Sequence, residues 1–258
     1  MNPEISIDDF ADLALDVGTS LIASGAHSGR VHTNIKRLAE KWKFSIQMNL
    51  TYNGILITVR DVSEPTKTVT RYRNTPPHSV HLAQLTEYSR MTWKVADGDL
   101  SFAETIEEVK RIKQNRNYNH WIVAVAVGFS CACLCVLAGG SFLNGCIAFV
   151  AAFVGSVTRF HIVKWKFNPM ISFVIASFVT SMIAGMDTLF SIGTSPEATL
   201  ATAVLYLVPG VPLINSVIDL IEGYLTSAWN RALFGAFILL CIAVGMALSI
   251  ALLGINNF

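Results

Sequence analysis

The chain has 258 residues, of which 52% are hydrophobic and 14% are charged. This composition is too apolar for an average soluble protein. The formal net charge is +1 and there is no strongly basic stretch, which argues against a nucleic-acid partner. Among 19 basic and 18 acidic side chains, only eight lie after residue 120, so a polar first half precedes an apolar second half.

The amino-terminal half begins with two predicted helices. Ser6 and Asp9 have the spacing of a helix capping box, and apolar residues then recur at helical spacing up to the turn SGAHSG at residues 24–29. A second amphipathic helix is expected from about Val31 to Trp42. The acidic start of the chain has no basic region before an apolar core, so we expect no cleaved signal peptide.

Three short segments then predict a small antiparallel sheet, because apolar and polar side chains alternate and turn-forming residues separate the segments. They are residues 44–50, 54–60 and 67–73. Helix is expected again from Val80 to about Val95, and Ser101 with Glu104 predicts the cap of a further helix. Together these elements predict a cytoplasmic α+β domain over residues 1–117.

The remainder, residues 118–258, predicts a transmembrane domain. Long stretches without charge recur there, and about 20 apolar residues in a helix span a hydrocarbon core of roughly 30 Å. The predicted spans are about 121–140, 142–158, 169–187, 198–218 and 233–254. The predicted fold class is a membrane protein in which a small cytoplasmic α+β domain precedes a bundle of five transmembrane α-helices, one of them broken by proline and glycine.

The lysines and arginines predict the orientation of these spans. Positive side chains precede the first span and follow the second, whereas the loop after the third contains only Asp187 and Glu197. The positive set is Lys110, Arg111, Lys113, Arg116, Arg159, Lys164 and Lys166, with Arg231 between the last two spans. We therefore expect a cytoplasmic amino terminus and a periplasmic carboxyl terminus. An odd number of spans excludes a simple inverted repeat within this chain.

The fourth predicted span contains residues that a regular membrane helix avoids. Pro209 and Pro212 lack backbone donors, so the helix is expected to kink or unwind around Gly210. Beyond the break, polar side chains three or four residues apart share one helical face. They are Asn215, Asp219, Glu222 and Thr226.

Two interpretations of this polar face stay open. In the first, the face lines a bundle interior or a water path and serves a substrate or proton pathway, because ionisable groups are costly near a membrane. In the second, Asp219 and Glu222 lie just past the cytoplasmic end of the span, solvated and paired with Arg231. Arg159 and Arg231 are candidates to attract a carboxylate, although each also fits a positive-inside anchor.

No metal site is expected. The five cysteines lie in apolar segments, and the spacing Cys131-x-Cys133-x-Cys135 is wrong for zinc loops. Arg30, in the turn between the first two helices, is a candidate anion ligand or a helix-cap residue. The histidines of the first half are more typical of solvated side chains than of ligands; they are His27, His32, His78 and His81.

Several long segments resemble the threonine/serine exporter family. They are VPGVPLINSVIDLIEGYLTSAWNRA, LIASGAHSGRVHTNIKRLA, DGDLSFAETIEEVKRI and WIVAVAVGFSCACLCVLAGG, and the likeness covers essentially the whole chain. One amino-terminal domain with five spans is similar to the larger subunit of a two-component form of the family, implicated in succinate export in enteric bacteria. The resemblance implies a partner, a separate small multi-span membrane subunit of the same family that supplies the missing second half.

The resemblance also assigns residues to two motifs. The break motif of the family is matched by Pro209, Gly210, Pro212, Asn215 and Asp219, and its cytoplasmic turn by Ser24, Gly25, Ala26 and Arg30. His27 and His32 stand where many members have acidic residues, which weakens any catalytic role for that turn. The sequence contains no nucleophile elbow, Walker loop or zinc signature.

The expected function is a subunit of a secondary transporter in the bacterial inner membrane, without a cofactor and not an enzyme. It would export a small carboxylate, succinate or a related dicarboxylate, coupled to proton entry through protonation of Asp219. One alternative is export of threonine or serine. Another is a regulatory or assembly subunit whose cytoplasmic domain senses a metabolite. Homo-oligomerisation is left open.

Overall fold

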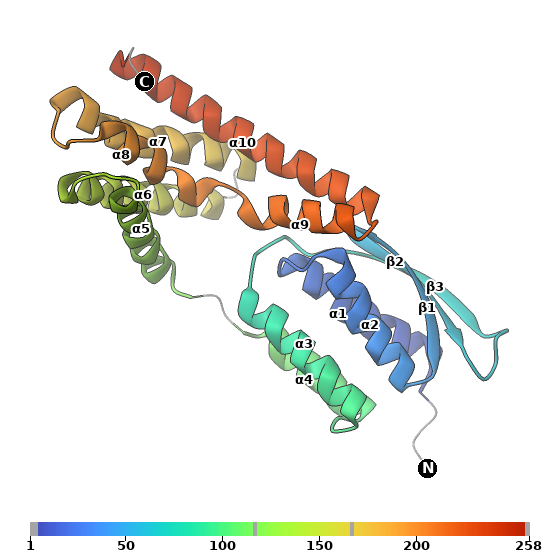
Figure 1. Ribbon diagram of the computed structural model, residues 1–258. Helices are drawn as coiled ribbons and strands as arrows, with labels where there is room; N and C mark the ends of the chain where they lie inside the picture. The colour runs from blue at the N-terminus through green and yellow to red at the C-terminus, as the bar shows by residue number, and fades with distance from the viewer. Residues whose placement is uncertain (1–4, 116–117, 166–167, 256–258) are drawn as a thin grey trace. The chain divides into compact units, whose positions relative to one another are not determined.

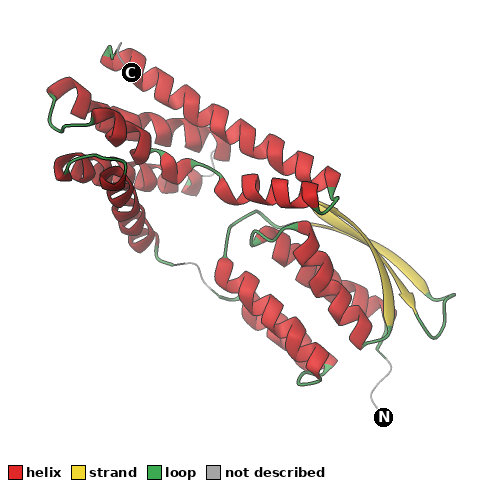
Figure 2. Ribbon diagram, in the orientation of Figure 1, coloured by secondary structure: helices red, strands yellow, loops and turns green. Residues whose placement is uncertain are grey.

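A computed structural model describes residues 5–115, 118–165 and 168–255 of the chain. Arg116, Lys166 and the end of the carboxyl-terminal tail, which entered the orientation argument, lie outside these described residues. The chain forms two compact units, in which most residues are helical (Figures 1 and 2). The first unit contains residues 1–117 and 210–234, and the second contains residues 118–209 and 235–258.

Four helices of the first unit begin with side-chain caps. α1 is Ile7–Ala23, α2 is Ser28–Lys41, α3 is Leu82–Asp97 and α4 is Phe102–Lys113. The predicted capping box is present at α4, where Ser101 and Glu104 bind each other's backbone amides. Ser6 instead makes a simpler cap, in which its hydroxyl accepts from the amide of Asp8.

Histidines cap the other two helices of this unit. The side chain of His27 accepts from the amide of Arg30 at the start of α2, and that of His81 accepts from the amide of Gln84 at the start of α3. His78 stacks on Tyr52 with ring centroids 3.9 Å apart. Three of the four histidines therefore have specific protein partners, although His78 is exposed and His27 and His81 are half-buried.

The predicted sheet is present with the strands close to their expected positions. β1 is Phe44–Thr51, β2 is Gly54–Asp61 and β3 is Thr68–Asn74, and they form an antiparallel sheet in the order β1-β2-β3. Ile55, Ile57 and Val59 alternate along β2 and are fully buried, as the period of two in a strand requires. α1 and α2 pack against the sheet, and Phe10 stacks on Phe44 at 4.6 Å between ring centroids.

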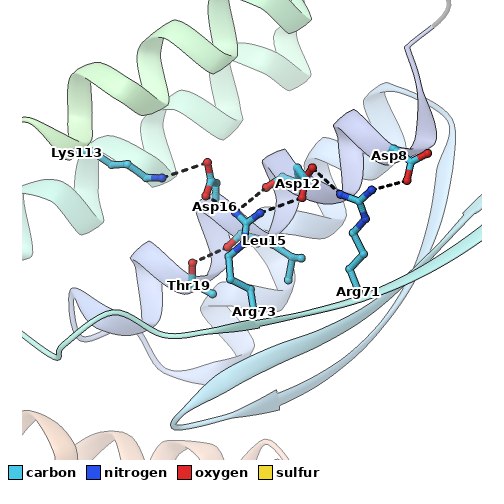
Figure 3. A network of polar contacts seen from close by, with 8 residues as sticks. All are labelled: Asp8, Asp12, Leu15, Asp16, Thr19, Arg71, Arg73 and Lys113. Atoms are coloured by element: carbon cyan, nitrogen blue, oxygen red, sulfur yellow. Dashed lines mark hydrogen bonds and ion pairs between the residues drawn. The ribbon is translucent and has the colours of Figure 1, made fainter.

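Charged side chains fasten β3 and α4 to one face of α1 (Figure 3). Arg71 and Arg73 of β3 and Lys113 of α4 all form ion pairs with this face, the Lys113 pair at 3.1 Å. The acidic partners recur every fourth residue and are Asp8, Asp12 and Asp16. These groups are one-third to one-half exposed, so their contribution is modest in comparison with the buried core.

The second unit is built from long apolar helices. α5 is His120–Leu137, α6 is Phe142–Lys164, α7 is Pro169–Phe190 and α10 is Leu225–Leu253; each is long and apolar enough to cross a membrane. α10 begins in the first unit and ends in the second. Small residues allow the helices to approach closely, since Ala148, Ala151 and Ala176 are fully buried.

The break predicted in the fourth span is present. α8 is Pro196–Ala203, the 3-10 helix η1 is Leu205–Leu207, and α9, which is Gly210–Ile221, starts directly after Pro209. The segments before and after the break meet at 67°. If this bent pair is one span, the described residues contain five candidate spans, and otherwise four. The predicted broken span at 198–218 thus consists of separate helices on either side of the break.

Candidate functional site

α9 has one polar face and one apolar face. Asn215 and Asp219 are buried, whereas Ile214 and Val217 on the other side are exposed. The spacing of three and four residues accounts for this segregation, because such residues share a face of a helix. Glu222, just after the helix, continues the polar face and is exposed.

This polar face contacts the turn between α1 and α2. The side-chain amide of Asn215 donates to the Gly25 carbonyl at 2.8 Å. The backbone amide of Ser28 donates to Oδ1 of Asp219 at 2.7 Å, and its hydroxyl donates to Oδ2 at 3.1 Å. A carboxylate is favoured at the start of α2, where amides lack helical partners and carry partial positive charge. Two sequence-predicted sites, the cytoplasmic turn and the polar face, therefore meet within the first unit. Ser24 is buried in the same turn.

Arg231 of α10 completes this buried network. Its Nε lies 3.0 Å from Oδ2 of Asp219, and its Nη2 donates to the Ala26 carbonyl at 2.8 Å. The Asp219 side chain is 0% exposed and that of Arg231 is 2% exposed. Leaving either charge buried alone would cost several kcal/mol, so the two groups depend on each other. The pairing foreseen in the second sequence interpretation is present, but the pair is buried and not solvated.

Glu222 and His27 extend the network toward the surface. Nδ1 of His27 lies 3.1 Å from Oε2 of Glu222 and 3.3 Å from the amide nitrogen of Arg30. One nitrogen cannot accept from the amide and donate to the carboxylate at once, so these contacts are alternatives. Ligand atoms of His27, Asp219 and Glu222 lie within 4.8 Å of one another, close enough for a metal ion. A cation there would meet the charge of Arg231, and both Asp219 oxygens already accept hydrogen bonds, so the geometry favours an ion-pair network.

A cavity of about 600 Å³, which we call the arginine cavity, lies along α2 and α3. Arg30 and Arg37 are seven residues apart, so both project from the same face of α2. They line the cavity together with His27, Trp93 and Glu222. The predicted anion candidate Arg30 is therefore one of two arginines that face the same space.

The two guanidinium groups of the arginine cavity bind only neutral partners within the described residues. Arg30 donates to the Ser89 hydroxyl from Nε at 3.2 Å and Nη2 at 3.1 Å. Arg37 donates to Thr92 at 2.7 Å and lies 3.7 Å above the ring of Trp93. Burial lowers the pKa of Arg30 and of Arg37. An anion in the cavity would compensate both charges.

The second unit has a buried carboxylate of its own. Asp187 was expected in a loop, but it lies inside α7 and is fully buried. Its Oδ2 accepts from Asn144 Nδ2 at 2.6 Å and from the Thr199 hydroxyl at 2.6 Å, and its Oδ1 accepts from the Gly193 amide at 2.8 Å. These donors come from α6, α8 and the segment that joins α7 to α8. The carboxylate thus fastens three elements together without a cation.

This unit also contains Arg159, which forms no ion pair with a carboxylate among the described residues. The guanidinium of Arg159, on α6, lies 4.2 Å above the Phe173 ring of α7. Its Nε is buried and has no hydrogen-bond partner in the described part of the chain. On the neighbouring elements, the Tyr206 hydroxyl of η1 lies 3.1 Å from Oγ1 of Thr180. Of the two arginines proposed to attract a carboxylate, only Arg231 is neutralised by a described carboxylate.

These features define a class of protein before any comparison. An α+β unit with a buried ion-pair network is followed by helices that can cross a membrane, and polar centres lie among apolar helices. Such intramembrane polar groups are typical of proteins that move substrates or ions.

Comparison with known proteins identifies the family. The family described as "Putative threonine/serine exporter" matches residues 12–253. The chain therefore belongs to the threonine/serine exporter family, which is named for transport and not for catalysis.

Three relatives are similar along most of this chain. A "Probable succinate transporter subunit" from Klebsiella aerogenes is 26% identical over 95% of both chains. A protein of the same name from Escherichia coli K12 is also 26% identical over 95% of both chains. A "Probable threonine/serine exporter" from Mycobacterium tuberculosis is 23% identical over 95% of this chain and 46% of its own length. No solved structure matches the chain.

Sequence reasoning missed the partners of the predicted residues. Ser28 stands in the turn that was singled out, but nothing in one sequence connects it to Asp219 of a distant helix. In the second unit, Asp187 was expected in a loop, and neither Asn144 nor Tyr206 was predicted to be a polar residue with a buried partner. The available signal was the presence of hydrogen-bonding side chains within apolar segments, because such groups need buried partners in a membrane.

Proposed function

We propose that the chain is a subunit of a secondary transporter that exports a small carboxylate, succinate or a related dicarboxylate. The observation that carries this proposal is the match over 95% of both chains to two relatives named as succinate transporter subunits. Threonine and serine remain the alternative substrates, because the family and the third relative carry that name. All three substrates have a carboxylate, so each needs a cationic or hydrogen-bonding group in the path.

The proposed setting is the bacterial inner membrane, with a cytoplasmic first half, five spans and a periplasmic carboxyl terminus. The lysine and arginine distribution supports this orientation. A separate small membrane subunit of the same family is the proposed partner. The word "subunit" in the names of two relatives supports a partner, as does the relative of which this chain covers only 46%.

Coupling to proton entry is assigned to Asp219. Protonation would remove its charge, leave Arg231 uncompensated and weaken the contacts to Ser28 that join α9 to α2. The helix break at Pro209, Gly210 and Pro212 would let α9 change its direction. Asn215 and Glu222 belong to the same proposed pathway as secondary contacts of α9 with the α1–α2 turn.

Transport by inside-out membrane vesicles tests the proposal. Vesicles are given radiolabelled succinate, or separately threonine, under an imposed proton gradient, with this chain alone, the partner alone, and both. We expect gradient-driven accumulation only with both subunits. Accumulation of threonine but not of succinate would show that threonine is the substrate. Transport by the partner alone would refute a carrier role for this chain. Asp219→Asn, scored per amount of folded protein, should abolish accumulation against a gradient; normal transport would refute its coupling role.

The arginine cavity favours a second candidate function, that of a metabolite-sensing regulatory subunit. Its two arginines form no ion pair with a carboxylate of the described residues, although Glu40 and Asp97 act on Arg37 at longer range, and the cavity is large enough for a small dianion. Glu222, which lines it, follows α9, so a bound anion would act next to the polar face. Calorimetry on the full-length chain should detect a dicarboxylate or phosphate that Arg37→Gln no longer binds, while transport by the partner alone continues.

A further inference from the structure

Arg159 is a half-buried charge in the apolar half of the chain, and no carboxylate of the described residues forms an ion pair with it. α6 carries no other formal charge until its last residue, Lys164. The buried Nε of Arg159 has no partner within the described residues. A charge inside a membrane helix is costly and is usually paired with another group or with a ligand.

The geometry of Arg159 suits a planar anion. One face of its guanidinium is covered by the Phe173 ring, at 4.2 Å from ring centroid to the central carbon. Stacking of this kind fixes the plane of the group and leaves its N–H donors at the edge. Two parallel N–H groups at that edge match the two oxygens of a carboxylate.

Hydrogen-bonding groups of other elements lie against the face of α6 that carries Arg159. Gly155 is one helical turn before Arg159, and a side chain at Gly155 would collide with the Thr180 and Tyr206 hydroxyls. The absence of a side chain at this position therefore brings both hydroxyls against α6. Thr180 donates its own proton to the Ala176 carbonyl at 2.7 Å, so Tyr206 is the donor in the bond between the two hydroxyls.

Tyr206 links this strip to the helix break. It lies on η1, three residues before Pro209, where the regular hydrogen-bond pattern of the span stops. Its hydroxyl can rotate from Thr180 to an incoming anion without movement of the backbone, because Thr180 keeps its bond to Ala176. Broken helices are frequent places for substrate contacts in transporters.

We propose that Arg159 and Tyr206 bind one carboxylate group of the transported substrate. This inference rests on the proposed function, because it takes the substrate to be a small carboxylate. Arg159 supplies the charge and two directed donors, and Tyr206 supplies a single neutral donor. Arg231 does not serve this purpose, since Asp219 already neutralises it. One guanidinium binds one carboxylate in this way, so the second carboxylate of a dicarboxylate must be bound by other residues.

Binding to the complete transporter in maltoside micelles tests this site. Calorimetry measures the affinity for succinate and for succinamate, which retains one carboxylate. Arg159→Gln should weaken both ligands by about tenfold or more, Arg159→Lys by less, and Tyr206→Phe by about threefold. Lys164→Gln is the matched control, because it removes the same charge from the exposed end of the same helix and should leave affinity unchanged. Size-exclusion chromatography of each variant excludes misfolding.

The outcomes separate this inference from the proposed function. If the wild type binds succinate and Arg159→Gln binds it equally well, the site is wrong while the function stands. An equal loss in Arg159→Gln and Lys164→Gln would also overturn the site, because it indicates a general effect of positive charge. If the wild type binds no carboxylate, both fail.

A phospholipid headgroup could supply the same anionic chemistry as a substrate. The measurement is therefore repeated in nanodiscs with and without phosphatidylglycerol. Competition between this lipid and succinate that disappears in Arg159→Gln would assign the site to a headgroup and overturn the proposal. Unchanged succinate affinity with the lipid present would support it.

Discussion

Each unit of the chain contains an arginine that is removed from water at least in part, because Arg231 is buried and Arg159 is half-buried, and the surroundings of the two differ. In the first unit Arg231 has a carboxylate at 3.0 Å and a carbonyl that accepts from its Nη2 at 2.8 Å, so its charge is compensated, although its Nε makes no hydrogen bond within the described residues. In the second unit Arg159 has an aromatic ring beneath it and no described anion. A compensated charge holds segments of a chain together, whereas an uncompensated one is available to a ligand.

The buried carboxylates show the complementary difference. Asp219 depends on a cation, and its network joins the α1–α2 turn to α9 and α10. Asp187 depends on three neutral donors, and it joins α6, α7 and α8. Both therefore stabilise contacts between elements that are distant in sequence.

The largest effect is expected when the pair in the first unit is broken. Asp219→Asn removes the negative charge and leaves Arg231 buried, so the free energy of unfolding should fall by about 3–5 kcal/mol. Chemical unfolding of the full-length chain in detergent measures the change. Glu222→Gln is the control, because its carboxylate is exposed and should matter little.

A double variant sharpens this first test. Asp219→Asn combined with Arg231→Gln removes both charges, so it should be less destabilised than the sum of the two single variants. Strict additivity of the two changes would contradict the buried ion pair.

Replacement of the other buried carboxylate should have the next largest effect. Asp187→Asn removes the negative charge that three donors bind, and its new amide group must face a donor from Asn144 or Thr199. Hydrogen bonds to charged groups contribute about 1.5–3 kcal/mol each, so we expect a loss of about 2 kcal/mol or more. The unfolding midpoint measures it. Glu197→Gln, an exposed acid in α8, should unfold like the wild type; equal effects of both variants would contradict a specific role of Asp187.

The burial of Tyr52 next to Arg231 also predicts that the free energy of unfolding falls at alkaline pH. Burial raises the pKa of Tyr52, although the positive charge of Arg231 opposes the shift. The unfolded state therefore loses this proton at lower pH than the folded state. The stabilisation is complete below the unfolded pKa of about 10 and is lost as the pH rises through the folded pKa.

Unfolding between pH 8 and pH 11 measures this dependence. One proton changes the free energy of unfolding by at most about 1.4 kcal/mol per pH unit. The decline should be less steep in Tyr52→Phe than in the wild type. Tyr72→Phe, which changes an exposed tyrosine, should follow the wild type. Identical slopes in all three proteins would show that Tyr52 does not titrate differently on folding.

Much of the fold could be predicted because its signals are local. Alternation located the strands, Ser101 and Glu104 located a helix start, and Pro209 with Gly210 located the break. Residues 210–234 could not be assigned to the first unit, because that depends on Ser28 and Asp219 meeting in space. Hydropathy also placed Asp187 in a loop, because a charged residue is taken to mark the end of an apolar helix. A carboxylate that is bound by neutral donors can nevertheless lie inside such a helix.

The smallest effect is expected at the exposed counterpart of the buried pair. Arg73 contacts Asp12 and Asp16 on α1, but these side chains are 35–49% exposed. Water screens such pairs and ordering long side chains costs entropy, so Arg73→Gln should lower the free energy of unfolding by about 1 kcal/mol or less. The difference should disappear at 1 M salt, where the screening length is about 3 Å. The Asp219→Asn effect should persist at the same salt concentration, because ions do not reach a side chain with no exposed surface. If salt reduced the effects of Arg73→Gln and Asp219→Asn equally, the Asp219–Arg231 pair would be open to solvent. The proposed difference between this buried pair and the exposed pairs of Arg73 would then be wrong.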